Sequence, residues 1–145
     1  MKDKSLKWSL PYLVFDAKHH LDVRGKPGIY RIRAFTEDGE PLPISRAVGV
    51  DPLGVLHIGK SNDLGRRLNR FRRAVEGAQS PHQAGREYAK WHFERLVPRE
   101  RLWFDYVLTA DGAEALALER RLHKEYRVQF LDRPPLDGTS GQSSK

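Results

Sequence analysis

Glu119 is the acidic residue whose position most strongly suggests chemistry. Residues 112–127 have the apolar periodicity of a helix, with Leu118, Leu122 and Tyr126 on one face. At about 100° per residue, Glu119 falls within that apolar stripe. An unpaired carboxylate directed towards a core is costly, so we expect a cation, a metal ion or a polar cavity beside it. The alternative is an ion pair with a nearby arginine, or a position at the rim of the helix.

Arg67 is the basic residue with a comparable position. Residues 62–74 are predicted to form a helix whose apolar stripe contains Leu64, Leu68 and Phe71, and Arg67 flanks that stripe. A guanidinium stays charged at any working pH, and its planar fork suits a phosphate group. Arg67 is therefore predicted to reach over an adjacent sheet and bind phosphate. The other arginines of this helix are predicted to form a solvated cationic face that attracts nucleic acid without specificity: Arg66, Arg70, Arg72 and Arg73.

The elements that would position these residues follow from periodicity and turn signals. Alternation over 28–35 predicts a half-buried strand with Tyr30 on one face. Residues 47–59 predict a β-hairpin with a four-residue connection. The other predicted elements are a strand over 101–109 and helices over 82–96 and 112–127. We therefore expect an α+β fold with a small, mainly antiparallel sheet of three to four strands flanked by helices.

Length and composition limit the classes of protein that need to be considered. The 145 residues are expected to form one domain over 28–137, with residues 1–27 as an N-terminal extension packing on it and 138–145 as a flexible tail. The net charge of +7 favours a polyanionic partner such as nucleic acid. The absence of cysteine excludes a thiolate zinc site. No apolar run approaches the ~20 residues of a membrane span, so we expect a cytoplasmic protein that does not bind membranes.

Three motifs in order resemble the pattern of the GIY-YIG nuclease domain family. Gly28-Ile29-Tyr30 lies on the first predicted strand, His57-Ile58-Gly59 closes the predicted hairpin, and Arg67 follows on the next helix. The later segment LALERRLHKEY places the family's glutamate at Glu119. The resemblance covers about residues 28–137, and the ordered set at matching intervals is a fairly specific signal.

This resemblance implies an activity and roles for individual residues. Members of the family cut phosphodiester bonds in nucleic acid with one divalent metal ion held by the glutamate. Glu119 would then hold Mg²⁺ or Mn²⁺, and Arg67 would stabilise the phosphate. Tyr30 would activate or orient water, and Lys60 would contact the phosphate or depress a neighbouring pKa. His82 would donate to phosphate or take the proton of the leaving oxygen, unless it is only a surface histidine in the first turn of its helix.

The chain departs from the family pattern at three positions. His57 replaces the second-motif tyrosine, and since imidazole titrates near 6.5 it could be the better general base. Phe71 occupies a position that often holds a hydroxyl or an imidazole, and it can serve only packing. Asp137 stands where the family has asparagine, and a charged group there could add a metal ligand or spoil a hydrogen bond.

We therefore expect a metal-dependent endonuclease, with DNA as the expected substrate and either His57 or Tyr30 as the general base. The alternative is a nucleic-acid-binding module of the same fold without catalysis. A third hypothesis, a protein-interaction domain, is less favoured because it gives the basic helix no specific function. Because no second domain is visible, targeting would come from this domain itself, from a homodimer or from a partner protein.

Overall fold

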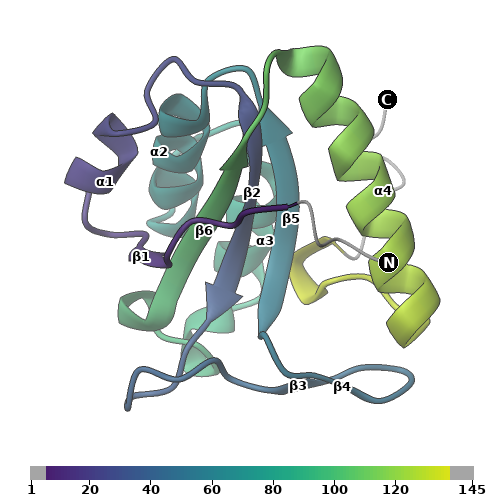
Figure 1. Ribbon diagram of the computed structural model, residues 1–145. Helices are drawn as coiled ribbons and strands as arrows, with labels where there is room; N and C mark the ends of the chain where they lie inside the picture. The colour runs from purple at the N-terminus through teal and green to yellow at the C-terminus, as the bar shows by residue number, and fades with distance from the viewer. Residues whose placement is uncertain (1–5, 138–145) are drawn as a thin grey trace.

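The computed structural model describes residues 6–137, and within them four strands form one antiparallel sheet in the order β1-β6-β2-β5 (Figure 1). A separate two-stranded sheet is formed by β3 and β4. The strands are β1 (Tyr12–Leu13), β2 (Gly28–Ala34), β3 (Ile44–Ser45), β4 (Val50–Asp51), β5 (Val55–Ser61) and β6 (Leu102–Leu108). The predicted α+β class with a small antiparallel sheet is confirmed.

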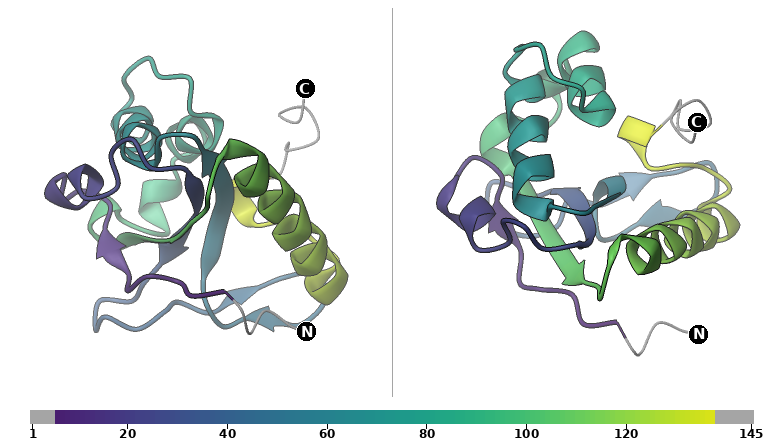
Figure 2. Two further views of the ribbon diagram at one scale, coloured as in Figure 1. Left: turned by 45° about the horizontal axis from the view of Figure 1, so that its top comes forward. Right: turned by 90° about the horizontal axis from the view of Figure 1, so that it is seen from above.

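Helices cover both faces of the four-stranded sheet (Figure 2). The helices are α1 (Lys18–Leu21), α2 (Leu64–Val75), α3 (Gln83–Lys90) and α4 (Gly112–Phe130), with 3-10 turns η1 (Phe93–Arg95), η2 (Arg99–Arg101) and η3 (Pro135–Asp137). α2 and α3 pack on one face and α4 on the other, so the sheet lies between two helical layers.

The central strand β2 is buried on both faces. Tyr30 and Ile32 belong to the core under α2 and α3, whereas Ile29 belongs to the core under α4. Even Arg33 is only 7% exposed, because the carboxylate of Asp105 on β6 accepts a hydrogen bond from it at 3.1 Å. The prediction of a half-buried strand is therefore wrong, since β2 has a strand on each side and helices on each face.

The predicted hairpin over 47–59 does not form. β5 pairs with β2 instead, and β4 pairs back onto β3. The turn itself is present, because the Asp51 carboxylate accepts hydrogen bonds from the backbone N–H groups of Leu53 and Val55. This turn directs the chain into β5, which then becomes the edge strand of the main sheet.

Two predicted helix ends also differ from the structure. α3 ends at Lys90 rather than near residue 96, because His92 adopts a left-handed backbone with φ of 53°. α4 continues to Phe130, beyond the predicted end at residue 127, and Leu131 follows with φ of 51°. A left-handed residue cannot continue a right-handed helix, so each one marks a boundary.

Residues 6–27 lie against the sheet. β1 pairs with β6, and Val14 and Val23 are fully buried. His20 is only 4% exposed. The predicted flexible tail, 138–145, lies outside the described residues. No helix among residues 6–137 has the length and apolar character needed to cross a membrane.

Candidate functional site

Tyr30 lies at the centre of the candidate site and is held there by a glycine. It is paired with Gly59 of β5, so the two residues face each other across neighbouring strands. A Cβ atom on Gly59 would lie 2.7 Å from the Tyr30 hydroxyl oxygen and 2.7 Å from His57 Nε2. At such distances a Cβ atom would force the buried rings to shift, so glycine is the residue that fits the last position of the second motif without strain. The tyrosine ring occupies the space that any other side chain would fill.

Four of the predicted site residues are joined by hydrogen bonds. The Tyr30 hydroxyl lies 3.0 Å from His57 Nε2 and 2.6 Å from His82 Nε2. His57 Nδ1 lies 2.5 Å from the Asp137 carboxylate. We call these four residues the Tyr30 cluster. They come from β2, β5, the start of α3 and η3, so the sheet, a helix and the C-terminal turn all contribute.

His82 is an internal residue. It precedes α3, and its Nδ1 accepts a hydrogen bond from the backbone N–H of Gly85, which makes it the N-cap of the helix. The side chain is 0% exposed, and the Phe71 ring packs on it with ring centroids 5.1 Å apart. The idea of a surface histidine is therefore wrong, and His82 as folded here contacts Tyr30 rather than a phosphate.

Asp137 closes the edge of the sheet. Its second carboxylate oxygen accepts a hydrogen bond from the backbone N–H of Ile58 at 3.1 Å. The carbonyl oxygen of Ile58 lies 2.9 Å from Nε2 of His123 on α4. Both outward-facing backbone groups of Ile58 are thus satisfied by side chains, which protects β5 from pairing with another strand. Asp137 is 6% exposed, so it positions His57 and β5 and does not present a charge to solvent.

Tyr30 is fully buried, and its environment acts on the phenol in two directions. Burial raises its pKa, whereas the positive charge of Arg67 lowers it. Arg67 reaches Tyr30 from α2, which begins after Asp63, whose carboxylate accepts a hydrogen bond from Arg66 N–H. Because the Tyr30 side chain is 0% exposed, it touches no solvent in this arrangement. Its influence on a ligand has to pass through His57 or Arg67.

Glu119 lies on the other side of β5, on α4. It is half-buried and makes no hydrogen bond or ion pair with any other residue in the range 6–137. Burial raises its pKa, an effect opposed by the positive charges of His123, His57 and Lys60 and reinforced by the negative charge of Asp137. Within residues 6–137 the alternative of an ion pair with a nearby arginine is wrong. The half-buried side chain is what the other alternative, a position at the rim of the helix, also predicts.

The donor set around Glu119 limits the metal ion that could bind. No group of three or more His, Asp or Glu side chains suited to a metal ion occurs within the described part of the chain. A closed protein cage is therefore absent from residues 6–137. An Mg²⁺ ion does not need such a cage, since it keeps several waters and binds through one or two carboxylates and substrate phosphates. The unpaired carboxylate of Glu119 fits that kind of site.

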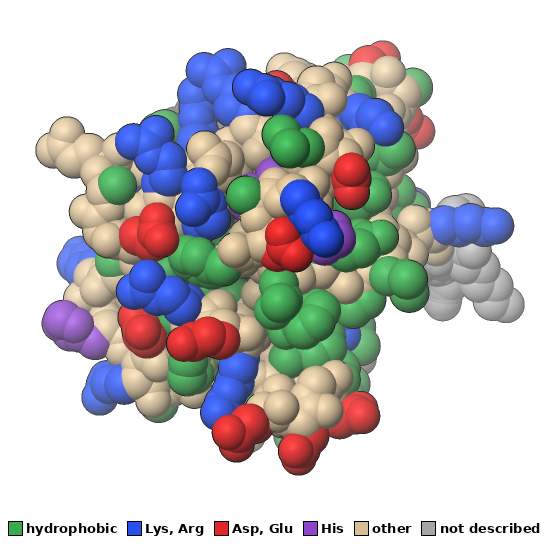
Figure 3. All heavy atoms as spheres, turned by 90° about the vertical axis from the view of Figure 1, so that its left-hand side faces the viewer, with side chains coloured by type: hydrophobic (Ala, Val, Ile, Leu, Met, Phe, Trp, Pro, Cys, Tyr) green, Lys and Arg blue, Asp and Glu red, His purple; other side chains and the backbone are tan. Residues whose placement is uncertain are grey.

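The remaining predicted contacts lie on exposed surfaces. Lys60 is exposed at the end of β5, and its pairing with Ile29 places it on the α4 face together with Glu119. Arg66 is exposed on α2 and Arg70 is half-buried, and neither side chain bonds to the Tyr30 cluster. Lys and Arg side chains gather at the upper left of the face formed by α1 and α2 (Figure 3).

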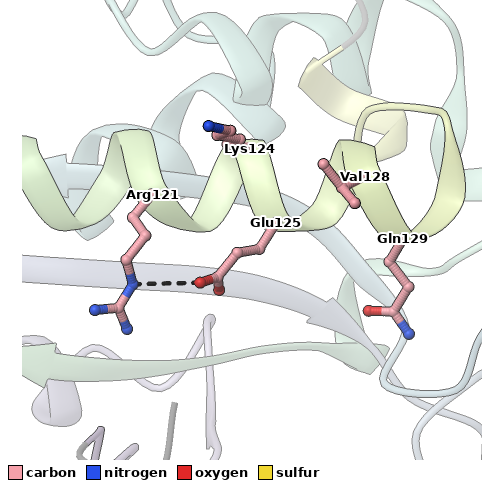
Figure 4. Close-up of a pocket in the computed structure, with 5 residues that line it drawn as sticks. All are labelled: Arg121, Lys124, Glu125, Val128 and Gln129. Atoms are coloured by element: carbon pink, nitrogen blue, oxygen red, sulfur yellow. Dashed lines mark ion pairs between the residues drawn. The ribbon is translucent and has the colours of Figure 1, made fainter. Parts of the chain in front are cut away.

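A shallow hollow on α4 lies away from this site. Its lining consists of Arg121, Lys124, Glu125, Val128 and Gln129 (Figure 4). Arg121 and Glu125 form an ion pair of 3.4 Å there. At 3.6 residues per turn, these side chains face away from the direction of Glu119. The hollow therefore provides positions for control substitutions rather than part of the candidate site.

Comparison of the chain with protein-family models, with curated proteins and with solved structures finds no match. The resemblance to the GIY-YIG pattern thus depends on this chain's own motifs and on their arrangement.

The contact between His57 and Asp137 is the feature that sequence reasoning missed. In the sequence each residue stands out only separately, as a departure from one family pattern. Their separation of 80 positions in the chain hides the contact. The available signal is that an imidazole and a carboxylate replace neutral side chains at two sites of the same pattern.

Proposed function

We propose that this chain is a divalent-metal-dependent endonuclease that hydrolyses phosphodiester bonds in nucleic acid, with DNA as the expected substrate. The observation that supports the proposal is the interaction of complementary charged groups around β5. The charges of Lys60 and His57 act on the Glu119 carboxylate, which has no ion-pair partner within residues 6–137, and the charge of Arg67 acts on Tyr30 from the other face of the sheet. Such a set combines a metal ligand, phosphate ligands and a proton acceptor.

Arg67 and Lys60 would bind the scissile phosphate. Arg67 is half-buried beside Tyr30, so its guanidinium is partly shielded from water and oriented before a ligand arrives. Lys60 is exposed and can adapt to the bound backbone. Charge that builds on the phosphate oxygens during attack would be offset by both cations. Arg66 and Arg70 would add non-specific attraction to the backbone.

Glu119 would hold the metal ion. When bound, Mg²⁺ or Mn²⁺ polarises the phosphate and makes water easier to deprotonate. Within residues 6–137 no arginine or lysine forms an ion pair with the Glu119 carboxylate, so its oxygens are available to the metal ion.

The Tyr30–His57 pair would receive the proton that the attacking water loses. Their two polar atoms are 3.0 Å apart, so one proton can pass between them. His57 is the more accessible member, at 9% exposed. The expected setting is the cytoplasm, with targeting supplied by the domain itself, by residues 1–27, by a second copy of the chain or by a partner protein.

The test is cleavage of a panel of duplex, single-stranded and branched DNA and RNA, with and without Mg²⁺ or Mn²⁺. We expect metal-dependent cleavage of at least one DNA substrate. Glu119→Gln should lower the rate about 1,000-fold or more, since it removes the charge that holds the metal. Glu125→Gln is the matched control, because it is the same change on the outer face of the same helix.

Cleavage by Glu119→Gln at the native rate would contradict the assignment. Loss of activity in both variants would also contradict it, since the effect would then come from the helix as a whole. Thermal unfolding of both variants identifies any loss that is caused by misfolding.

One observation favours the second candidate, a nucleic-acid-binding module without catalysis. Tyr30 and His82 are both fully buried, so two of the residues implied in the chemistry do not reach solvent as folded here. This candidate predicts salt-sensitive binding through the cationic face and no product after long incubation with metal. The same panel therefore distinguishes the two.

A further inference from the structure

We infer that Asp137 and His82 fix the direction of every hydrogen bond in the Tyr30 cluster, so that His57 Nε2 is the acceptor for the Tyr30 proton. This makes Asp137 and His82 positioning residues, whereas the motif pattern suggests a metal ligand at Asp137 and a phosphate contact at His82. The role of these two residues in hydrolysis rests on the proposed function. The arrangement of protons is independent of the proposed function, because it follows from the hydrogen bonds of the cluster alone.

The protonation of His82 fixes the first hydrogen bond of the cluster. The backbone N–H of Gly85 donates to His82 Nδ1 at 3.3 Å, so this nitrogen carries no proton. A neutral imidazole then carries its proton on Nε2. Burial lowers the pKa of His82, which supports the neutral form. His82 Nε2–H therefore donates to the Tyr30 oxygen, 2.6 Å away.

The direction of the next hydrogen bond, between Tyr30 and His57, follows because a phenol has only one proton to donate. Because Tyr30 receives a hydrogen bond from His82, its own O–H is available for its other neighbour, His57 Nε2, at 3.0 Å. His57 Nε2 must then be an acceptor, and the ring proton lies on Nδ1. That Nδ1–H donates to the Asp137 carboxylate at 2.5 Å.

Asp137 is held in the orientation that this requires. One of its oxygens accepts from His57 and the other accepts from the Ile58 backbone N–H. The carboxylate is 6% exposed, so water does not compete for these oxygens. A carboxylate, which can only accept, is the side chain that holds His57 in the Nδ1–H form.

The proton between Tyr30 and His57 can therefore move from the phenol oxygen to His57 Nε2. As the Tyr30 O–H bond breaks, the His57 Nε2–H bond forms, which leaves a phenolate and an imidazolium. The phenolate faces His82 Nε2–H and the positive charge of Arg67. The imidazolium faces the Asp137 carboxylate.

The arrangement can be tested in the wild-type chain without any substrate. Long-range ¹H–¹⁵N correlation spectra of the imidazole rings distinguish the two neutral tautomers. We expect His57 to be protonated on Nδ1 and His82 on Nε2. The opposite tautomer at either residue would overturn the inference, whether or not the protein cleaves nucleic acid.

Asp137→Asn tests the role in catalysis. The amide has the shape of the carboxylate, and its oxygen can keep the hydrogen bond from Ile58 N–H. Its NH₂ group would then point at His57 Nδ1 and force the ring proton onto Nε2, towards Tyr30. We expect this change of tautomer together with a loss in turnover of about 100-fold and an unchanged KM. Asp132→Asn is the matched control, on a carboxylate that pairs with Arg46 outside the cluster.

The outcomes separate the two proposals. A changed tautomer with native turnover would overturn the role of Asp137 while the endonuclease assignment stands. A wild-type chain that cleaves nothing would overturn the endonuclease, and the wild-type tautomers would still decide the arrangement of protons. If Asp137→Asn fails to fold, the tautomers of His57 and His82 in the wild-type spectra still support or overturn the inference.

Discussion

The two sides of β5 handle buried polar groups in opposite ways. Towards α2 and α3, the Tyr30 hydroxyl, both histidine rings and the Asp137 carboxylate all have partners, and His82 is completely buried. Towards α4, Glu119 is half-buried and has no hydrogen-bond or ion-pair partner within residues 6–137. The two carboxylates thus have the same charge and different environments.

This difference indicates that Asp137 orients its neighbours, whereas Glu119 can bind a ligand. A carboxylate whose oxygens are both occupied contributes to stability and orients its neighbours, but it has no free lone pair directed at a ligand. An unpaired carboxylate with a raised pKa costs stability, and it is available to a cation. The comparison predicts that Asp137 will matter to folding and Glu119 to ligand binding.

The largest effect is expected from removing each carboxylate in turn. Asp137→Ala leaves the ring N–H of His57 and the backbone N–H of Ile58 without acceptors, and should cost about 3–5 kcal/mol of unfolding free energy. Glu119→Ala removes no hydrogen bond and should cost less than about 1 kcal/mol. Urea unfolding measures both values. Equal losses would show that the two sides of β5 do not differ in this way.

The same comparison can be made between two arginines of α2, Arg67 beside Tyr30 and Arg73 in solvent. Arg67→Lys keeps the charge but loses the planar fork, so turnover of the proposed endonuclease should fall about 100-fold. Arg73→Lys, an exposed position on the same helix, should leave turnover within about twofold. Steady-state rates on the best substrate of the panel measure both. Similar losses in the two variants would mean that α2 supplies only general positive charge.

His20 shows what burial costs when no partner is provided. Neither of its ring nitrogens has a hydrogen-bond partner among the described residues, and burial lowers its pKa from 6.5 to about 4. Below pH 6.5 the unfolded chain therefore binds a proton that the folded chain does not. Folding stability should fall by up to about 3 kcal/mol from this group as the pH drops from 6.5 to 4.

His20→Leu should remove that part of the pH dependence. The measurement is urea unfolding at several values between pH 4 and 7 for the wild type and the variant. His92→Asn, at an exposed position with a left-handed backbone that asparagine tolerates, is the control. Parallel stability curves for wild type and His20→Leu would refute the assignment.

A loss of stability smaller than that of Asp137→Ala is expected at Gly59. Gly59→Ala places a methyl group against the Tyr30 ring and His57 Nε2, and the buried rings must shift to accept it. We expect a loss of about 2 kcal/mol in unfolding free energy. A cost below about 0.5 kcal/mol would mean that the Tyr30 cluster is loose enough to repack.

Several features of the fold and site are predictable because their signals are local. The apolar stripes of α2 and α4 lie within a few positions of the structures they specify. The same periodicity identifies Arg67 and Glu119, since a charged residue beside an apolar stripe is visible on a helical wheel. Helix ends are less predictable because left-handed residues such as His92 have no distinctive sequence signal.

Local patterns in the sequence are enough to predict the α+β class, the basic helix and the unusual positions of Arg67 and Glu119. The pairing of β5 with β2, the burial of Tyr30 and His82, and the contact of Asp137 with His57 are visible only in the folded chain. The two groups of features differ in the range of the interactions that create them. Helical periodicity acts over three or four residues, whereas strand pairing and the closing of an exposed edge join groups up to 80 positions apart, and no local pattern records them.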